Sequence, residues 1–160
     1  LKEELERLPP DAADEKVELY LEMVPIYRDR MKLDVMVSNT YQAILQLRPE
    51  HAGALEALAG WHEGKGRFSE LVQVLGRLAE ATRDPAAKAA TWRRIAGVWS
   101  DKLGKPQNAA QALDKALQAN PYDTEAEAAL VDIYQKSKAW RPLVELGRRQ
   151  ISYMQSGRSR

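Results

Sequence analysis

The chain has 160 residues, of which 44% are hydrophobic and 29% are charged, and its formal net charge is +1. This composition is that of a globular protein, and the small net charge gives no electrostatic reason to expect nucleic acid or an anionic membrane as a partner. The absence of cysteine excludes disulfides and thiolate metal sites, and no apolar run approaches the roughly 18 residues that would span a membrane.

Apolar residues recur three and four positions apart along the whole chain, which predicts an all-α protein. A helix fragment at 1–8 is expected to end at Pro9-Pro10, and Pro25 is expected to kink the first long helix. Four helical hairpins follow the fragment, with Gly66 and Gly104 in the turns of two of them. Their paired helices are predicted at 13–30 and 34–48, 51–64 and 68–83, 86–103 and 106–119, and 123–136 and 140–155.

Three prolines, Pro49, Pro85 and Pro121, lie at equal intervals of 36 residues. A fixed period of this length is typical of repeat arrays, in which each unit buries its apolar face against its neighbours. The period predicts a single domain over 1–160, and because the sequence opens inside a helical pattern, we expect a fragment of a longer array. The domain divides into the end of a preceding helix at 1–10, repeats at 11–49, 50–85, 86–121 and 122–155, and a tail at 156–160.

Large, small and aromatic residues follow a fixed order within the hairpins. The third repeat shows it best, with Trp92, Ile95-Ala96, Trp99, Ala109, Leu113, Ala116 and Pro121. This order resembles the tetratricopeptide repeat, although the first and third repeats need one extra residue between their helices. The resemblance implies a right-handed α-solenoid of about four antiparallel hairpins. It also implies a non-catalytic scaffold or adaptor that binds another protein. The ligand would be a peptide segment or a partner helix that lies in a concave groove.

In the tetratricopeptide family the first helix of each pair lines that groove, so the register assigns candidate binding positions. They are Glu56, Gly60 and Glu63 in the second repeat, Arg93, Gly97, Ser100 and Asp101 in the third, and Ala128, Asp132, Gln135 and Lys136 in the fourth. Glycine at 60 and 97 would let a ligand backbone come close. The pair Arg93-Arg94 could hold a carboxylate or a phosphate. The lysine–asparagine clamp with which some members bind C-terminal carboxylates is absent at the matching positions.

Four tryptophans and two histidines complete the candidates. Trp92, Trp99 and Trp140 fall at core positions, whereas Trp61 lies beside the buried stripe and is the best aromatic candidate for a ligand contact. His62 fills an aromatic slot of the repeat and is expected to be packed. The glycine-rich segment at 60–66 is one residue short of a phosphate loop and follows no strand, so it is predicted to be an interhelical turn.

No arrangement of nucleophile, base or paired carboxylates indicates an enzyme, and no cofactor or metal site is expected. A structural spacer, or a regulatory domain fused to an enzyme, remains an alternative. Residues 1–30 hold nine acidic and five basic side chains, and 140–160 hold five arginines and one glutamate. We interpret this asymmetry as a solvated face and a short basic tail, with self-association through the ends as the alternative. Apolar side chains at the ends would take part: Leu5, Leu8, Ile151, Tyr153 and Met154. The alanine- and arginine-rich helices favour a bacterial protein, and a cytoplasmic location is expected.

Overall fold

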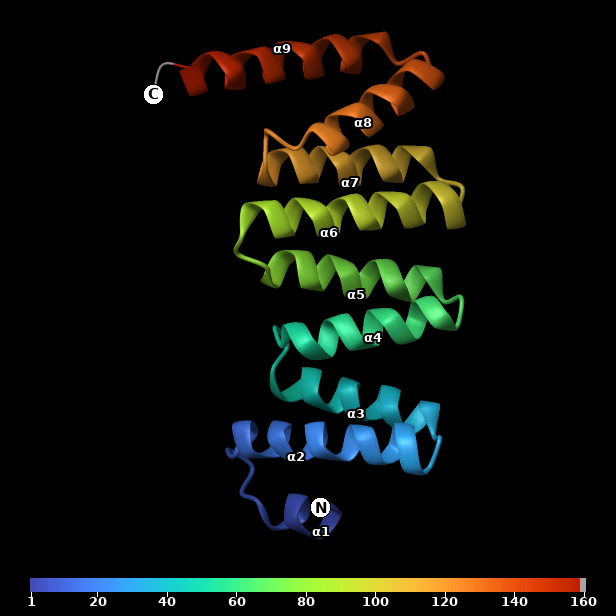
Figure 1. Ribbon diagram of the computed structural model, residues 1–160, viewed down its shortest axis with the longest axis vertical. Coiled ribbons are helices and arrows are strands. Elements are labelled where there is room, and N and C mark those ends of the chain that lie inside the picture. Colours follow the sequence, from blue (N-terminus) through green and yellow to red (C-terminus); the bar gives the residue numbers. More distant parts are fainter. Residues whose placement is uncertain (159–160) are drawn as a thin grey trace. The chain divides into compact units, whose positions relative to one another are not determined.

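A computed structural model describes residues 1–158, and its regular elements are all helical (Figure 1). The helices form two compact units, unit 1 over Leu1–Ala81 and unit 2 from Thr82 onward, each of which is described by itself. Unit 1 contains α1 (Lys2–Arg7), α2 (Ala13–Pro25), the π-helical turn η1 (Ile26–Arg30), α3 (Asp34–Leu47), α4 (Ala52–Gly64) and α5 (Phe68–Ala81). Unit 2 contains α6 (Pro85–Gly97), the π-helical turn η2 (Val98–Lys102), α7 (Pro106–Ala119), α8 (Thr124–Lys136) and α9 (Trp140–Arg158).

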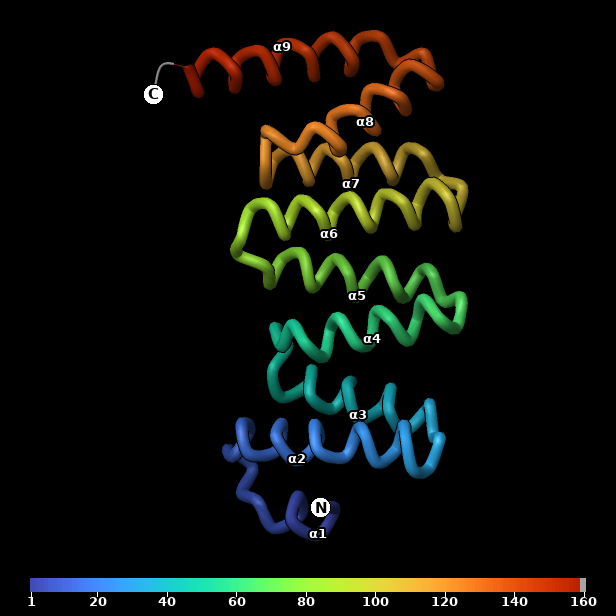
Figure 2. Tube along the Cα trace, in the orientation of Figure 1, coloured from blue at the N-terminus to red at the C-terminus, as the bar shows by residue number. Residues whose placement is uncertain are grey.

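The predicted helical hairpins are confirmed. In unit 1 the chain reverses between α2 and α3 and again between α4 and α5, and in unit 2 it does so between α6 and α7 and between α8 and α9 (Figure 2). Observed and predicted helix ends agree within two residues except at α9, which continues to Arg158 through most of the predicted tail. Residues 159 and 160 of that tail lie outside the described residues.

Each hairpin turns through one residue in the left-handed region. These residues are Lys32 (φ 51°), Gly66 (φ 68°), Gly104 (φ 61°) and Lys138 (φ 56°). The next residue donates its backbone N–H to the carbonyl of the aromatic-slot residue, as Arg67 does to His62 at 2.9 Å and Lys105 does to Trp99 at 2.7 Å. This bond closes the helix end in the manner of a Schellman motif. The segment at 60–66 is therefore part of an α4 helix end and an interhelical turn, as predicted.

The extra residue of the first and third repeats lies inside the helix end and not in the turn. There α2 and α6 continue into the five-residue π turns η1 and η2, which the other hairpins lack. A π turn is the usual way in which a helix accommodates one inserted residue. The turn η1 follows Pro25, where a kink was predicted, but the equivalent turn η2 follows Gly97, so the proline is not required for this departure from α geometry.

Unit 2 repeats unit 1 at a constant offset. The helix α2 begins at residue 13 and α6 at residue 85, a difference of 72, and the same difference separates the starts of α3 and α7, α4 and α8, and α5 and α9. The proline interval of 36 is thus half of a longer period, in which a hairpin with a π turn alternates with a shorter one. This offset pairs the residues of unit 1 from α2 onward with equivalents in unit 2.

The core of each unit lies where consecutive helices pack together, most closely α4 with α5 in unit 1 and α6 with α7 in unit 2. In unit 1 α4 packs against α3 and α5, and in unit 2 α8 packs against α7 and α9. Leu55, Leu71 and Leu75 in unit 1 and Leu117 and Leu130 in unit 2 are among the fully buried side chains. Small residues such as Ala59 and Ala116, which have no exposed surface, let the helix backbones approach closely.

Candidate functional site

A groove of about 340 Å³ lies in unit 2 between the first helices of its two hairpins. Its walls come from α6 with η2 on one side and α8 on the other, and its floor comes from α7. Small and aliphatic side chains line the floor and the charged groups come from both walls. The lining residues are Arg93, Ala96, Gly97, Ser100, Asp101, Ala109, Leu113, Glu125, Ala129, Asp132 and Ile133.

The structure brings five of the predicted groove residues together in this cavity: Arg93, Gly97, Ser100, Asp101 and Asp132. Three others on α8, namely Ala128, Gln135 and Lys136, are exposed but do not line it. The α8 wall is made by Glu125, Ala129, Asp132 and Ile133, so Asp132 is the one position assigned on this helix that lines the cavity.

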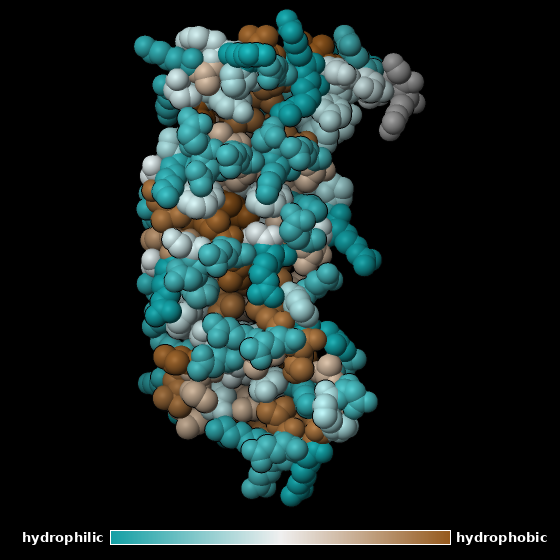
Figure 3. Space-filling view, turned by 180° about the vertical axis from the view of Figure 1, so that it is seen from behind, coloured by the Kyte–Doolittle hydropathy of each residue, from teal (hydrophilic) through white to brown (hydrophobic). Residues whose placement is uncertain are grey.

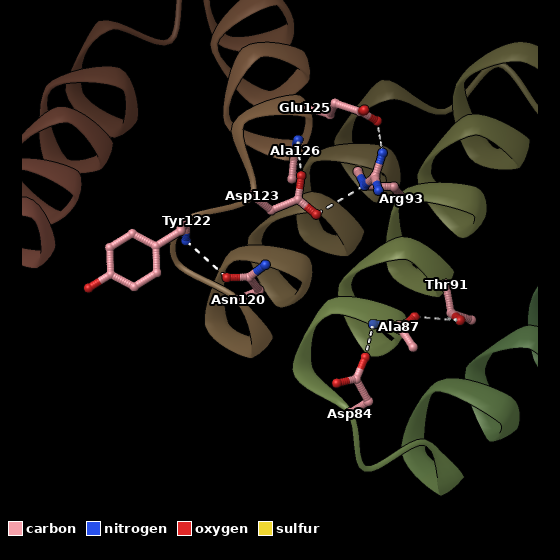
Figure 4. A network of polar contacts seen from close by, with 9 residues as sticks. All are labelled: Asp84, Ala87, Thr91, Arg93, Asn120, Tyr122, Asp123, Glu125 and Ala126. Carbon is pink, nitrogen blue, oxygen red and sulfur yellow. Dashed lines mark hydrogen bonds and ion pairs between the residues drawn. The ribbon is translucent and has the colours of Figure 1, made fainter. Parts of the chain in front are cut away.

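Arg93 is tied to the N-terminus of α8 (Figure 4). Its Nε lies 3.0 Å from Oδ2 of Asp123, and its Nη1 pairs with the Glu125 carboxylate. Asp123 also caps α8, because its Oδ1 accepts the backbone N–H of Ala126 at 3.0 Å. The guanidinium therefore joins two consecutive hairpins, so Arg93 can hold a ligand anion, as predicted for the Arg93-Arg94 pair, only by exchanging one of these carboxylates.

The other charged groups of the groove also have partners within unit 2. Oδ2 of Asp132 forms an ion pair with Nζ of Lys136 at 2.8 Å, and Oδ1 of Asp101 accepts a hydrogen bond from the Ser100 hydroxyl at 3.1 Å. Surface pairs of this kind contribute little to stability, so they are free to exchange for a ligand's groups. Gly97 lies on the α6 wall, and a Cβ added there would meet no atom within 4 Å. Packing within the protein therefore does not require glycine at this place.

The candidates of unit 1 do not gather in one cavity. Glu56, Gly60 and Glu63 are exposed on α4, and none of them lines the two depressions described in unit 1. Trp61 is half-buried: its ring meets that of His62 edge to face at 5.2 Å, and the Arg67 guanidinium lies 5.1 Å from its centroid. Arg67 therefore covers the indole that was expected to contact a ligand.

Two of the three tryptophans expected in the core are at least partly buried. Trp92 is buried and Trp99 is half-buried, and the amino group of Lys115 or Lys105 lies over the respective ring. Trp140 is 58% exposed, so its prediction as a core residue is wrong. Trp140, Val144, Ile151 and Met154 make an apolar stripe along α9 that no described residue covers, and Figure 3 shows hydrophobic surface at that edge of unit 2.

His62 is a packed histidine, as predicted, and it is only 6% exposed. Burial lowers its pKa, while Glu70 opposes the shift and Arg67 adds to it. The neutral imidazole is thus the form that the folded state prefers.

This shift predicts a pH dependence of stability. As pH falls through the ordinary histidine pKa of about 6.5, the unfolded chain takes up the proton first, so the folded state loses stability below that pH and loses none above it. His62→Phe removes the proton uptake while keeping an aromatic ring. Urea unfolding should therefore show that the free energy of unfolding of the variant rises relative to that of the native protein when the pH is lowered from 7.5 to 5. An equal difference between the two proteins at both pH values would show that His62 does not contribute to the pH dependence.

Among the described residues, no group of three or more histidine, aspartate or glutamate side chains could hold a metal ion. None of the helices over residues 1–158 is both long and apolar enough to cross a membrane.

The fold is a helical repeat of the tetratricopeptide-like type, and comparisons with known proteins agree with it. Two solved structures share the fold: the crystal structure of MamA, with a TM-score of 0.55 over 90% of this chain and 81% of that chain, and the MamA RS-1 ArsTM double mutant, with a TM-score of 0.51 over 95% and 80%. Both are 16% identical in sequence, which supports the fold alone.

Among curated proteins, the CTR9 homolog of Arabidopsis thaliana is 35% identical over 97 residues, or 59% of this chain. The chain spans 9% of the length of that relative. No protein-family profile matches the chain.

Proposed function

We propose that the chain is a non-catalytic protein-interaction module whose unit 2 groove holds a segment of a partner protein. The observation that carries the proposal is the groove itself, since α6, η2 and α8 present a charged and glycine-containing wall over an apolar floor. A peptide backbone can approach closely at Gly97, and apolar side chains can pack on Ala96, Ala109 and Leu113.

The helical-repeat likeness supports the same class of function. Repeat proteins present extended surfaces that are suited to holding other chains, and the groove lies between consecutive first helices, where such a surface forms. The carboxylates of Asp101, Asp132 and Glu125 have partners within the unit, and a bound segment would exchange some of these contacts for its own polar groups.

A structural spacer is the competing function, and the exposed apolar stripe of α9 favours it. The two functions differ in what they predict for the groove. A spacer needs the ends of the array and not the cavity between α6 and α8.

Filling the groove from within tests the proposal. Ala129→Trp places an indole in the cavity. Ala128→Trp places the same side chain at the neighbouring exposed position of α8, which does not line the cavity. Peptides selected from a displayed random library against residues 1–160 should bind Ala129→Trp at least about tenfold more weakly, because the indole occupies the ligand's volume. Binding to Ala128→Trp should be unchanged. Equal binding of the selected peptides to both variants would rule out the groove as the site.

A further inference from the structure

A second cavity, of about 440 Å³, lies in unit 1 between the second helices of its two hairpins. Gln42 and Gln46 line it from α3, and Gln73 and Arg77 line it from α5, each pair one helical turn apart. Beneath them His62 and the aliphatic side chains Leu45, Leu58 and Val74 form the base. This cavity belongs to the α3–α5 face and is separate from the first-helix face that carries the predicted groove residues.

The base of this cavity contains an unsatisfied polar group. His62 is 6% exposed and its Nδ1 has no hydrogen-bond partner. Buried polar atoms are paired in most folded proteins, so an unpaired imidazole nitrogen at the base of a cavity favours a ligand that carries a polar group.

At the equivalent place in unit 2, an internal carboxylate pairs with the arginine. At the offset of 72 residues, Asp114 corresponds to Gln42 and Arg149 to Arg77. Arg149 Nη2 donates to Asp114 Oδ1 at 2.6 Å, and Gln118 donates to Asp114 Oδ2 at 2.9 Å. Tyr134, the equivalent of His62, lies close by: burial raises the pKa of its phenol, and the Asp114 carboxylate raises it further.

Unit 1 has no carboxylate at this position, but it keeps Arg77 and Gln46, the equivalents of the two residues that bind the Asp114 carboxylate in unit 2. Gln42 cannot form the ion pair, and Arg77 instead donates from Nη2 to the Pro49 carbonyl at 3.3 Å, which leaves its other N–H groups without a described partner. Gln46 is the equivalent of Gln118 and is exposed at the cavity. Glu70 also lines the cavity and opposes an anion, but it makes no ion pair with a described residue.

We propose that the α3–α5 cavity of unit 1 binds a side-chain carboxylate of a partner protein, in the position that the Asp114 carboxylate takes in unit 2. Arg77 supplies the ion pair, and the amides of Gln42, Gln46 and Gln73 supply neutral N–H donors around it. This site is independent of the groove between α6 and α8, so either can fail without the other.

The test uses residues 1–160 and two capped peptides, acetyl-Ala-Ala-Glu-Ala-Ala-amide and the same peptide with glutamine in place of glutamate. The glutamate peptide should shift the NMR signals of the Gln42, Gln46 and Gln73 side-chain amides and of the Arg77 Nε–H, and the glutamine peptide should not. Equal shifts with both peptides would overturn the proposal. Shifts only with a peptide that carries a free C-terminal carboxylate would show that a side chain is not the source.

Two variants remove the site in different ways. Gln42→Asp restores the internal partner of Arg77, so it should raise the urea midpoint and weaken the glutamate peptide about tenfold or more, since a charge-assisted hydrogen bond is lost to the ligand. Arg77→Gln changes an exposed side chain and should weaken the peptide similarly. Asn39→Asp adds the same charge one turn earlier on α3, outside the cavity. It should leave both the urea midpoint and the affinity for the glutamate peptide unchanged. Unchanged peptide binding by both Gln42→Asp and Arg77→Gln would refute the site.

Discussion

Replacing Leu130 with alanine is expected to lower the free energy of unfolding by about 3–5 kcal/mol, the cost of deleting a large side chain where the surroundings cannot collapse. Leu130 has no exposed surface, and it belongs to α8, which packs against both α7 and α9. The variant therefore leaves a cavity in a helix that packs on two sides. Urea unfolding followed by circular dichroism measures the loss.

Val144→Ala is the matched control for Leu130→Ala. Val144 is an apolar residue of the same unit but is 53% exposed on α9, so its truncation should change stability by less than about 0.5 kcal/mol. If Leu130→Ala lowers the free energy of unfolding no more than Val144→Ala does, then Leu130 does not contribute to the core of unit 2 as its burial indicates.

Asp123→Ala is expected to cost about 2–3 kcal/mol, the second largest effect, because one side chain has two roles. The Asp123 carboxylate caps α8 by accepting the Ala126 N–H, which is worth about 1 kcal/mol, and it forms an ion pair with the Arg93 guanidinium. Its side chain is 8% exposed, so its removal leaves the partly buried Arg93 guanidinium with Glu125 as its remaining partner, and that carboxylate is largely exposed. Thermal and urea unfolding of the variant give the number.

Asp84→Ala separates the two roles of Asp123. Asp84 caps α6 by accepting the Ala87 N–H at 2.8 Å, and Arg93 does not reach it, so its loss should cost only the cap, about 1 kcal/mol. Equal costs for Asp84→Ala and Asp123→Ala would mean that the contact with Arg93 contributes nothing to joining the hairpins.

The helices were predictable because their ends carry local signals. Pro106 at a first turn and glycine at 66 and 104 fix where the chain reverses, and the apolar spacing fixes which face is buried. The two lysines at left-handed positions, Lys32 and Lys138, carry no such signal, yet their hairpins were still located by the neighbouring helices. Local signals were thus sufficient to predict the helices and the order of the turns.

The site was less predictable because it depends on which charged groups meet across helices. Arg93 was identified as a groove residue, but its pairing with Asp123 and Glu125 joins residues from separate hairpins. An aspartate before Thr124-Glu125 is a helix N-cap signal, so Asp123 could have been assigned that role. Trp140 was misplaced because the pattern marks a residue that can be buried and does not say whether a neighbour covers it.

The 72-residue offset was hidden for a different reason. The regular prolines suggested four equal repeats, whereas the π turns make alternate hairpins longer. At the informative positions the two units also differ in chemistry, with Gln42 opposite Asp114 and His62 opposite Tyr134. Only the helix bounds of the structure showed that these residues are equivalent.

The most direct test of the proposed function is an NMR titration of isotope-labelled chain with a peptide selected from the displayed library. The peptide should shift the backbone amides of Gly97, Asp101, Ala129 and Asp132 together, with one dissociation constant, because these residues line one groove. Shifts confined to the apolar stripe of α9, with the groove amides unmoved at saturation, would contradict the interaction site proposed here.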